Sequence, residues 1–447
     1  MFTGCAVLPD PQRPHPRPPR DHPTILIATS QFGAFSPRRR ALIILIFGGL
    51  WTLGSFSTDL FLPAMPTAAD ALRASESAVA LSVTTFLIGL GLGQLIAGPV
   101  SDGRGRRPTL IVGLAAFTGA AVVCTLAPTV QLLIAMRLVQ GMAAAFGLAI
   151  PNAMVTDYAR GREAARLFSW IVIIGGVAPL VASLAGAQML RLMGWRGPFV
   201  ALTAISVVAL VAVALWLPES LPPERRSTGG LRTALRTMGR LTRDGRFMGY
   251  TFTGAFIYMA FFAYLGGSSF VFQHVYGVSP TTYSVLFAVN ALGMLAAGQA
   301  NHRLLARFSP RALLAATLVA FAAAGVVVLV SALTGVGGIW GLAVPFFVIV
   351  AGMGVILPDL TALALSLHPD VAGTAAAYFG GLRLGLGALA MPLIGIGGTV
   401  TATSMGLLIT ASALAALALF AVTARRARDQ QVLLDLPEEK SSDVPVA

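Results

Sequence analysis

The chain has 447 residues, of which 56% are hydrophobic and only 11% are charged. Soluble domains carry about 25% charged residues, so this composition excludes the ordinary soluble class and indicates a membrane protein. The net charge of +13 would suit a nucleic-acid-binding protein, but the basic residues are dispersed over the segments between apolar runs. Cys5 and Cys124 lie far apart and the five histidines form no cluster with ligand spacing, so we expect neither a disulfide framework nor a metal site.

Apolar runs of about 20 residues, the length that a bilayer core requires, dominate the chain from residue 41 onward. Residues 1–40 are rich in Pro and Arg, and we interpret them as a disordered tail. The runs within 41–217 lie at about 41–62, 79–100, 108–127, 131–154, 167–190 and 197–217. A polar loop at 218–246 separates them from the runs within 247–424, at about 247–272, 281–301, 311–333, 339–366, 372–396 and 400–423. A second tail follows at 425–447, and the prediction is an all-α membrane protein with twelve transmembrane helices in two six-helix bundles.

The distribution of Lys and Arg predicts the orientation of these helices. Most of the 31 basic residues fall in the two tails, in the turn at 101–108, after the fourth and eighth runs, and in the 218–246 loop. On the other side lie only Arg73, Arg191 and Arg196, while Arg137 and Arg383 fall inside runs. The positive-inside rule therefore places both termini and the long central loop in the cytoplasm.

The two halves of the chain also resemble each other. The residues Leu92, Gly93, Leu95, Ala97 and Gly98 recur in the second half as Leu292, Gly293, Leu295, Ala297 and Gly298. A repeat of this kind favours a transporter built from two parallel six-helix repeats with pseudo-symmetric packing.

The segment GPVSDGRGRRP at 98–108 combines small residues with an Arg-rich turn between two apolar runs. It resembles the loop signature between helices 2 and 3 of the major facilitator superfamily, in the form found in the drug:proton antiporters of the bicyclomycin/chloramphenicol resistance (Bcr/CflA) type. Asp102 and Arg106 match that signature, whereas Gly103 replaces a basic residue and Arg104 an apolar one. The resemblance implies the superfamily fold and transport by alternating access, without a cofactor other than the proton gradient.

Two further stretches resemble this family and contain Asp59 and Arg137, the residues that we expect to couple transport to protons. STDLFLPAMP at 57–66 contains Asp59, an acid inside the membrane, which is costly and usually functional. AMRLVQG at 135–141 resembles the motif whose arginine is tied to proton coupling, which carries over to Arg137. The plainer alternatives are a solvated interfacial Asp59 and a structural Arg137 satisfied by backbone carbonyls.

Other motifs extend the resemblance over about 41–422. GGVAPLVASLAGAQ at 175–188 is similar to the antiporter motif, with Gly175 and Pro179 at its helix kink, although Ala178 and Ser183 depart from the pattern. WRGPF at 195–199, LPESLPPERR at 217–226 and FAYLGGSSFVFQHVYGVSP at 262–280 resemble stretches of the same subgroup.

The resemblance also implies a conformational latch between the two halves. The charged residues of the family's latch correspond here to Asp102, Arg106, Arg107 and Asp157. In the family, the acid of the loop faces the start of the eleventh helix. The alternative is that these residues are solvated loop charges.

We expect a substrate cavity between the halves, lined by aromatic faces and few fixed polar groups, which suits apolar compounds better than a sugar. The candidates are Phe61, Phe86, Asn152, Tyr258, Phe262, Tyr264, Asn290 and Tyr378. Asp359 and Arg383 stand where the Bcr/CflA pattern has amides, and we expect them to form a buried ion pair. The alternative is that Arg383 faces the cavity and contacts an anionic or strongly polar substrate.

These observations predict a secondary transporter, not an enzyme, that exports drug-like small molecules in exchange for protons. We expect a multi-pass monomer in the cell inner membrane, in contact with the lipid bilayer, that binds no nucleic acid. The alternatives are a proton-linked symporter, a dedicated metabolite exporter, or a membrane receptor or scaffold that has lost transport.

Overall fold

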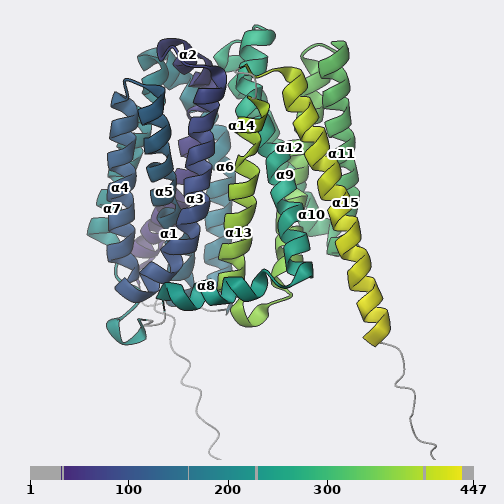
Figure 1. The fold of residues 1–447 in the computed structure, drawn as a ribbon. Helices are drawn as coiled ribbons and strands as arrows, with labels where there is room; N and C mark the ends of the chain where they lie inside the picture. The colour runs from purple at the N-terminus through teal and green to yellow at the C-terminus, as the bar shows by residue number, and fades with distance from the viewer. Residues whose placement is uncertain (1–31, 33–34, 160, 227–229, 396–398, 435–447) are drawn as a thin grey trace, which may run out of the picture.

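The computed structural model describes residues 32, 35–159, 161–226, 230–395 and 399–434, and these are helical with no strand among them (Figure 1). The first half of the chain forms α1 (Pro37–Asp59), η2 (Leu62–Ala64), α2 (Met65–Ala71), α3 (Glu76–Arg104), α4 (Arg106–Leu126), α5 (Val130–Tyr158), α6 (Gly161–Met193), η3 (Gly194–Arg196) and α7 (Gly197–Trp216). The connection to the second half contains η4 (Pro223–Arg225) and α8 (Gly230–Leu241). The second half forms α9 (Gly245–Phe270), η5 (Val271–Val275), α10 (Pro280–Leu304), α11 (Pro310–Thr334), α12 (Trp340–Leu365), η6 (Pro369–Val371), α13 (Ala372–Ala388), α14 (Ala390–Ile394) and α15 (Ala402–Leu434).

The twelve predicted transmembrane helices are confirmed. Within the described residues, 11 helical stretches are long and apolar enough to cross a membrane, and one of them, 166–216, holds both α6 and α7 on either side of η3. Most helix ends differ from the prediction by a few residues, but α15 continues to Leu434, into the predicted tail at 425–447. In particular, α1 begins at Pro37, inside the predicted N-terminal tail, because Ser36 caps it by accepting a hydrogen bond from the Arg39 amide.

The two halves use the same helix pairing. The second helix of the first half, α3, packs along α5, and its counterpart α10 packs along α12. Glycines make the first contact close: a Cβ on Gly141 would meet the Phe86 carbonyl, and a Cβ on Gly89 would meet the Leu138 carbonyl. In the other half a Cβ on Gly354 would meet the Met294 carbonyl. The predicted repeat therefore corresponds to equivalent helix–helix packing.

The bundle has two ends, which we call the α8 end and the α2 end after the short helices that lie there (Figure 1). The prediction of a polar loop at 218–246 missed α8, which lies across the α8 end and contacts both α3 and α13 (Figure 1). Met238 and Leu241 are buried beneath it, while Arg236 and Arg240 are exposed. This alternation of apolar and basic residues at helical spacing could have predicted α8 from the sequence.

Hydrogen bonds join the two halves at the α2 end. Ser269 Oγ on α9 donates to the Leu62 carbonyl at 2.6 Å. Glu76, at the start of α3, holds His274 Nδ1 at 2.7 Å with one carboxylate oxygen and accepts from the Val400 amide at 3.1 Å with the other. Since these contacts bridge the halves directly, the structure is closed at the α2 end.

Candidate functional site

Arg137 is the largest of the fully buried side chains, and it lies on α5 in the middle of the first half. Its Nη1 donates to the backbone carbonyl of Ser57 at 2.9 Å, to the Ser57 hydroxyl at 3.1 Å and to Gln140 Oε1 at 2.9 Å. The guanidinium also lies 4.4 Å from the ring centroid of Phe86 and 5.9 Å from that of Phe61. A cation held by a carbonyl and aromatic faces is thus tied to the last turn of α1.

Asp59 lies two residues beyond Ser57, as the last residue of α1, and is 6% exposed. Among the described residues, it forms no ion pair with Arg137, because the guanidinium is already engaged by the Ser57 carbonyl and by Gln140. A buried acid without a cation, at the carbonyl end of a helix, is in a setting where ionisation is costly.

A charge cluster lies at the α8 end, where α3, α4 and α5 end or begin. Arg106 pairs with Asp102 through Nη1 and with Asp157 through Nε at 3.2 Å, and it donates to the Ser101 hydroxyl at 2.7 Å. Asp157 also accepts from the Ser220 hydroxyl at 2.8 Å. The structure thus brings three of the four predicted latch residues together, all within the first half.

Arg107, the fourth predicted latch residue, points elsewhere. Its Nη2 donates to the Ala214 carbonyl near the end of α7 at 2.6 Å. Sequence reasoning missed Glu219, whose carboxylate accepts from the backbone amides of Arg106 at 3.0 Å and Arg107 at 3.2 Å. The stretch PESLPPERR at 218–226 holds two acids, Glu219 and Glu224, and their spacing does not reveal which of them meets the start of α4.

The antiporter-like motif lies where α6 meets both α1 and the second half. A Cβ on Gly175 would meet the Trp51 ring of α1, and a Cβ on Gly176 would meet the Leu295 side chain of α10. Pro179 lies inside α6, which runs without interruption from Gly161 to Met193. A Cβ at Gly175 would meet the rigid Trp51 ring, so glycine is required there, whereas the end of the Leu295 side chain can move away from a Cβ at Gly176.

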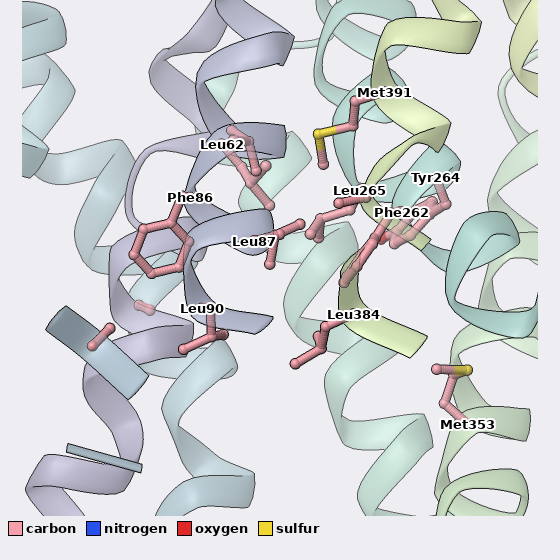
Figure 2. Close-up of a cluster of buried hydrophobic side chains, with 14 of the residues drawn as sticks. Leu62, Phe86, Leu87, Leu90, Phe262, Tyr264, Leu265, Met353, Leu384 and Met391 are labelled. Carbon is pink, nitrogen blue, oxygen red and sulfur yellow. The ribbon is translucent and has the colours of Figure 1, made fainter. Parts of the chain in front are cut away.

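The seam between the halves is apolar. Figure 2 shows Leu87 and Leu90 of α3 facing Leu265 of α9 and Leu384 of α13 across this seam. Of the predicted cavity residues, Phe61 and Phe86 surround Arg137, and the amide of Asn152 donates to the Leu148 carbonyl of its own helix at 3.0 Å. These three residues support the first half more directly than they line the seam.

The remaining predicted cavity residues lie in the second half. Tyr264 and Asn290 are hydrogen-bonded at 2.8 Å and line a pocket of about 200 Å³ between α9, α10 and α12. Phe262 is 3% exposed and packs edge-on against Tyr258, with ring centroids 5.2 Å apart. Tyr378 stacks on Phe247 near the α8 end, with centroids 6.3 Å apart. The structure therefore distributes the predicted aromatic residues over several places.

The predicted ion pair between Asp359 and Arg383 is wrong for this structure. Both residues are described, and Asp359 Oδ1 instead accepts from Asn301 Nδ2 at 2.9 Å. The Arg383 guanidinium lies between the rings of Tyr258 and Phe379, 4.9 and 5.0 Å from their centroids. An amide on α10 thus satisfies the acid on α12, and aromatic faces hold the arginine on α13.

The sequence profile of the Major Facilitator Superfamily matches residues 41–392, and the fold just described covers the same stretch. The chain belongs to the major facilitator superfamily. This membership makes it a multi-pass membrane transporter, and the resemblance noted from the loop at 98–108 is confirmed.

Curated relatives and solved structures agree with the superfamily assignment. The chain is 36% identical over 392 residues to the uncharacterised MFS-type transporter YdgK of Bacillus subtilis, covering 87% of this chain and 97% of the relative. It is 30% identical over 386 residues to multidrug resistance protein D of Escherichia coli, covering 83% and 95%. A D-xylose-proton symporter shares the fold with a TM-score of 0.69 at 16% identity, covering 84% of this chain and 97% of that one. The POT family transporter PepTSo does so with a TM-score of 0.70 at 14% identity, covering 89% and 99%.

Proposed function

We propose that this superfamily member exports drug-like small molecules in exchange for protons. The observation that carries the proposal is the joint between α1 and α5, where buried Arg137 holds the Ser57 carbonyl two residues before buried Asp59. Relatives named multidrug resistance protein D and chloramphenicol resistance protein support drugs as the substrate class.

Asp59 is the proton-carrying group in this proposal. It has no cation partner among the described residues, so it gains little by remaining ionised in a buried position. It ends α1 beside η2, where the carbonyls of Leu62 and Pro63 accept hydrogen bonds from Ser269 of α9 and Gln273 of η5. Protonation of Asp59 therefore acts next to the contact that closes the α2 end, which is how a proton can bias alternating access.

The latch and the substrate contacts complete the proposal. The Arg106 cluster with Asp102 and Asp157 stabilises one arrangement of the α8 end, while Gly175 and Gly176 let α6 approach α1 and α10 closely. Substrate contacts come from the apolar seam between the halves and from Arg383, whose Nε is buried without a partner in the described part of the chain. An arginine held by aromatic faces suits substrates that combine an apolar body with an anionic or strongly polar group.

The proposal includes an orientation and a compartment. The excess of Arg at the α8 end favours a cytoplasmic position for that end and for both termini. We place the protein in the cell inner membrane as a monomer that needs no cofactor beyond the proton gradient. In this orientation the structure is closed towards the outside.

Transport assays in proteoliposomes with an imposed pH gradient test the proposal, using chloramphenicol as the substrate. We expect export by the unmodified protein that depends on the gradient, and loss of that dependence in Asp59→Asn because an amide cannot ionise and so cannot bind and release a proton. Asp70→Asn is the matched control, since Asp70 is an exposed acid on α2 at the same end.

The assay also separates the other functions. Gradient-dependent uptake in the direction of proton flow would indicate a symporter, and binding without movement would indicate a receptor or scaffold. Normal gradient-driven export by Asp59→Asn would contradict the role of Asp59.

A further inference from the structure

Asp359 and Asn301 form a buried polar contact in the second half, near the α8 end. Asn301 lies on α10 and Asp359 on α12, and each residue is 2% exposed. The Asn301 Nδ2 donates to Asp359 Oδ1 at 2.9 Å. This contact is at the opposite end of the bundle from Asp59, which ends α1 near α2.

Two oxygen atoms in this contact have no partner. Asp359 Oδ2 and Asn301 Oδ1 are both buried, and neither receives a hydrogen bond within the described part of the chain. Both are acceptors when Asp359 is ionised, so they cannot satisfy each other in that state. A buried acceptor without a donor costs about 1–3 kcal/mol, and a buried charge without a cation costs more.

The charged groups on the helices packed against α12 do not supply the missing partner. They are Arg246 on α9, His302 and Arg303 on α10, Arg311 on α11 and Arg383 on α13. Among the described residues none of these forms an ion pair with Asp359. The Arg383 guanidinium is engaged by the rings of Tyr258 and Phe379 and by Thr361 Oγ1 at 3.5 Å.

We propose that Asp359 and Asn301 form a second proton-binding site, in which a proton on Asp359 Oδ2 is donated to Asn301 Oδ1. The acid and the amide then share two hydrogen bonds in a ring, and both unpartnered oxygens are satisfied at once. The only covalent change is the binding of one proton from water to the carboxylate, and its release reverses the step. The use of this proton for transport rests on the function proposed above.

The ring explains why an amide is a natural replacement for the acid. In Asp359→Asn, the new amide NH₂ donates to Asn301 Oδ1 in place of the acid O–H, and its carbonyl still accepts from Asn301 Nδ2. The variant therefore mimics the proton-loaded site, and it should fold. Asn301→Ala should instead destabilise the protonated site, because it leaves the acid proton without an acceptor.

Infrared spectroscopy of the purified full-length protein tests the site at neutral pH, using the carbonyl stretch of protonated carboxylic acids. We expect Asp359→Asn to remove one such band, and Asn301→Ala to shift that band to higher frequency because its hydrogen bonds are lost. Asp102→Asn is the control, since Asp102 is paired with Arg106 and is 43% exposed, and should leave the spectrum unchanged.

An unchanged protonated-acid region in Asp359→Asn would overturn the proposal, because it would mean that Asp359 is ionised. If Asp359→Asn removes a band but the same band keeps its frequency in Asn301→Ala, the acid proton is not donated to Asn301 and the ring is wrong. The spectra require no transport, so they decide this proposal even if export of drugs is disproved.

Discussion

Glu219 caps the N-terminus of α4 from a segment more than a hundred residues away, by accepting the backbone amide of Arg106 at 3.0 Å. The cap residue Gly105 has no side chain to do so, and it adopts a positive φ of 101°. A Cβ at Gly105 would meet the Glu219 carboxylate at 2.8 Å. The turn between α3 and α4 and the segment after α7 therefore form one unit, joined by a carboxylate at the positive end of a helix.

Replacing Glu219 with Ala should destabilise the protein. The amides of Arg106 and Arg107 would lose their acceptor, and we expect the free energy of unfolding to fall by about 1–3 kcal/mol. Thermal unfolding in detergent measures the change. Glu224→Ala is the control because Glu224 is exposed in the same connecting segment. Equal midpoints for the two variants would show that the cap contributes nothing.

The Arg106 cluster predicts that Asp157 matters more than Asp102. The Asp157 side chain is 20% exposed and bonds both Arg106 and Ser220, whereas the Asp102 side chain is 43% exposed. We expect Asp157→Asn to shift the equilibrium between the state open at the α2 end and the state open at the α8 end by about 1–2 kcal/mol, or about 5- to 30-fold in population. Asp102→Ala should shift this equilibrium less.

Cysteine accessibility at the α2 end and at the α8 end measures this shift. Arg104→Gln is the control, since Arg104 is an exposed residue in the last turn of α3. Unchanged accessibility in Asp157→Asn would place the latch elsewhere.

Arg383 should discriminate between substrates by charge. Two ring faces hold its guanidinium, and its partners among the described residues include no carboxylate. Hydrogen bonds to charged groups contribute about 1.5–3 kcal/mol, so Arg383→Gln should weaken binding of a carboxylate substrate by about 10- to 100-fold. The methyl ester of the same compound should be little affected.

Competition binding with the acid and its ester checks this prediction, and Arg383→Lys tests whether charge alone is enough. An equal loss for acid and ester in Arg383→Gln would indicate that Arg383 supports the helix packing of α13 and not a substrate contact.

The sequence predicted the helices well because each span is a long apolar run bounded by polar residues, and a bilayer accepts few other structures. It missed α8, whose helical period lies in a polar segment. The predicted run at 372–396 corresponds to one apolar helical stretch at 369–394, in which only Leu389 separates α13 from α14.

The partners of individual polar residues were harder to predict. Asp59 was identified as an acid inside the membrane and Arg137 by the resemblance of its motif, but the acceptor for Arg137 is a backbone carbonyl of Ser57, which no residue pattern reveals. We expected Asp359 to pair with Arg383, whereas its partner is the Asn301 amide, 58 positions away on another helix. Depth along a helix restricts which residues can meet, but the rotation of each helix decides which of them do.

Asp244 gives a prediction about pH, because it joins the start of α9 to the α12–α13 turn. Its Oδ1 accepts from the amides of Arg246 at 2.8 Å and Phe247 at 3.2 Å, and its Oδ2 lies 2.8 Å from His368 Nε2. Partial burial acts to raise the pKa of Asp244, but the two amides and His368 outweigh it and hold the pKa below its usual value.

A carboxyl whose pKa is lower in the folded state binds protons more weakly there than in the unfolded chain, so its contribution to stability is present above the unfolded value of about 4. That contribution is lost as the pH falls through the lower, folded value. Asp244→Ala should therefore reduce the free energy of unfolding by about 0.5–2 kcal/mol at pH 7, and the difference from the unmodified protein should shrink on acidification below about pH 4. Thermal unfolding across this pH range measures it, with Asp370→Ala, at an exposed acid in η6, as the control. A difference that stays constant down to acidic pH would contradict a cap by the ionised carboxylate, and would mean that Asp244 acts through packing alone.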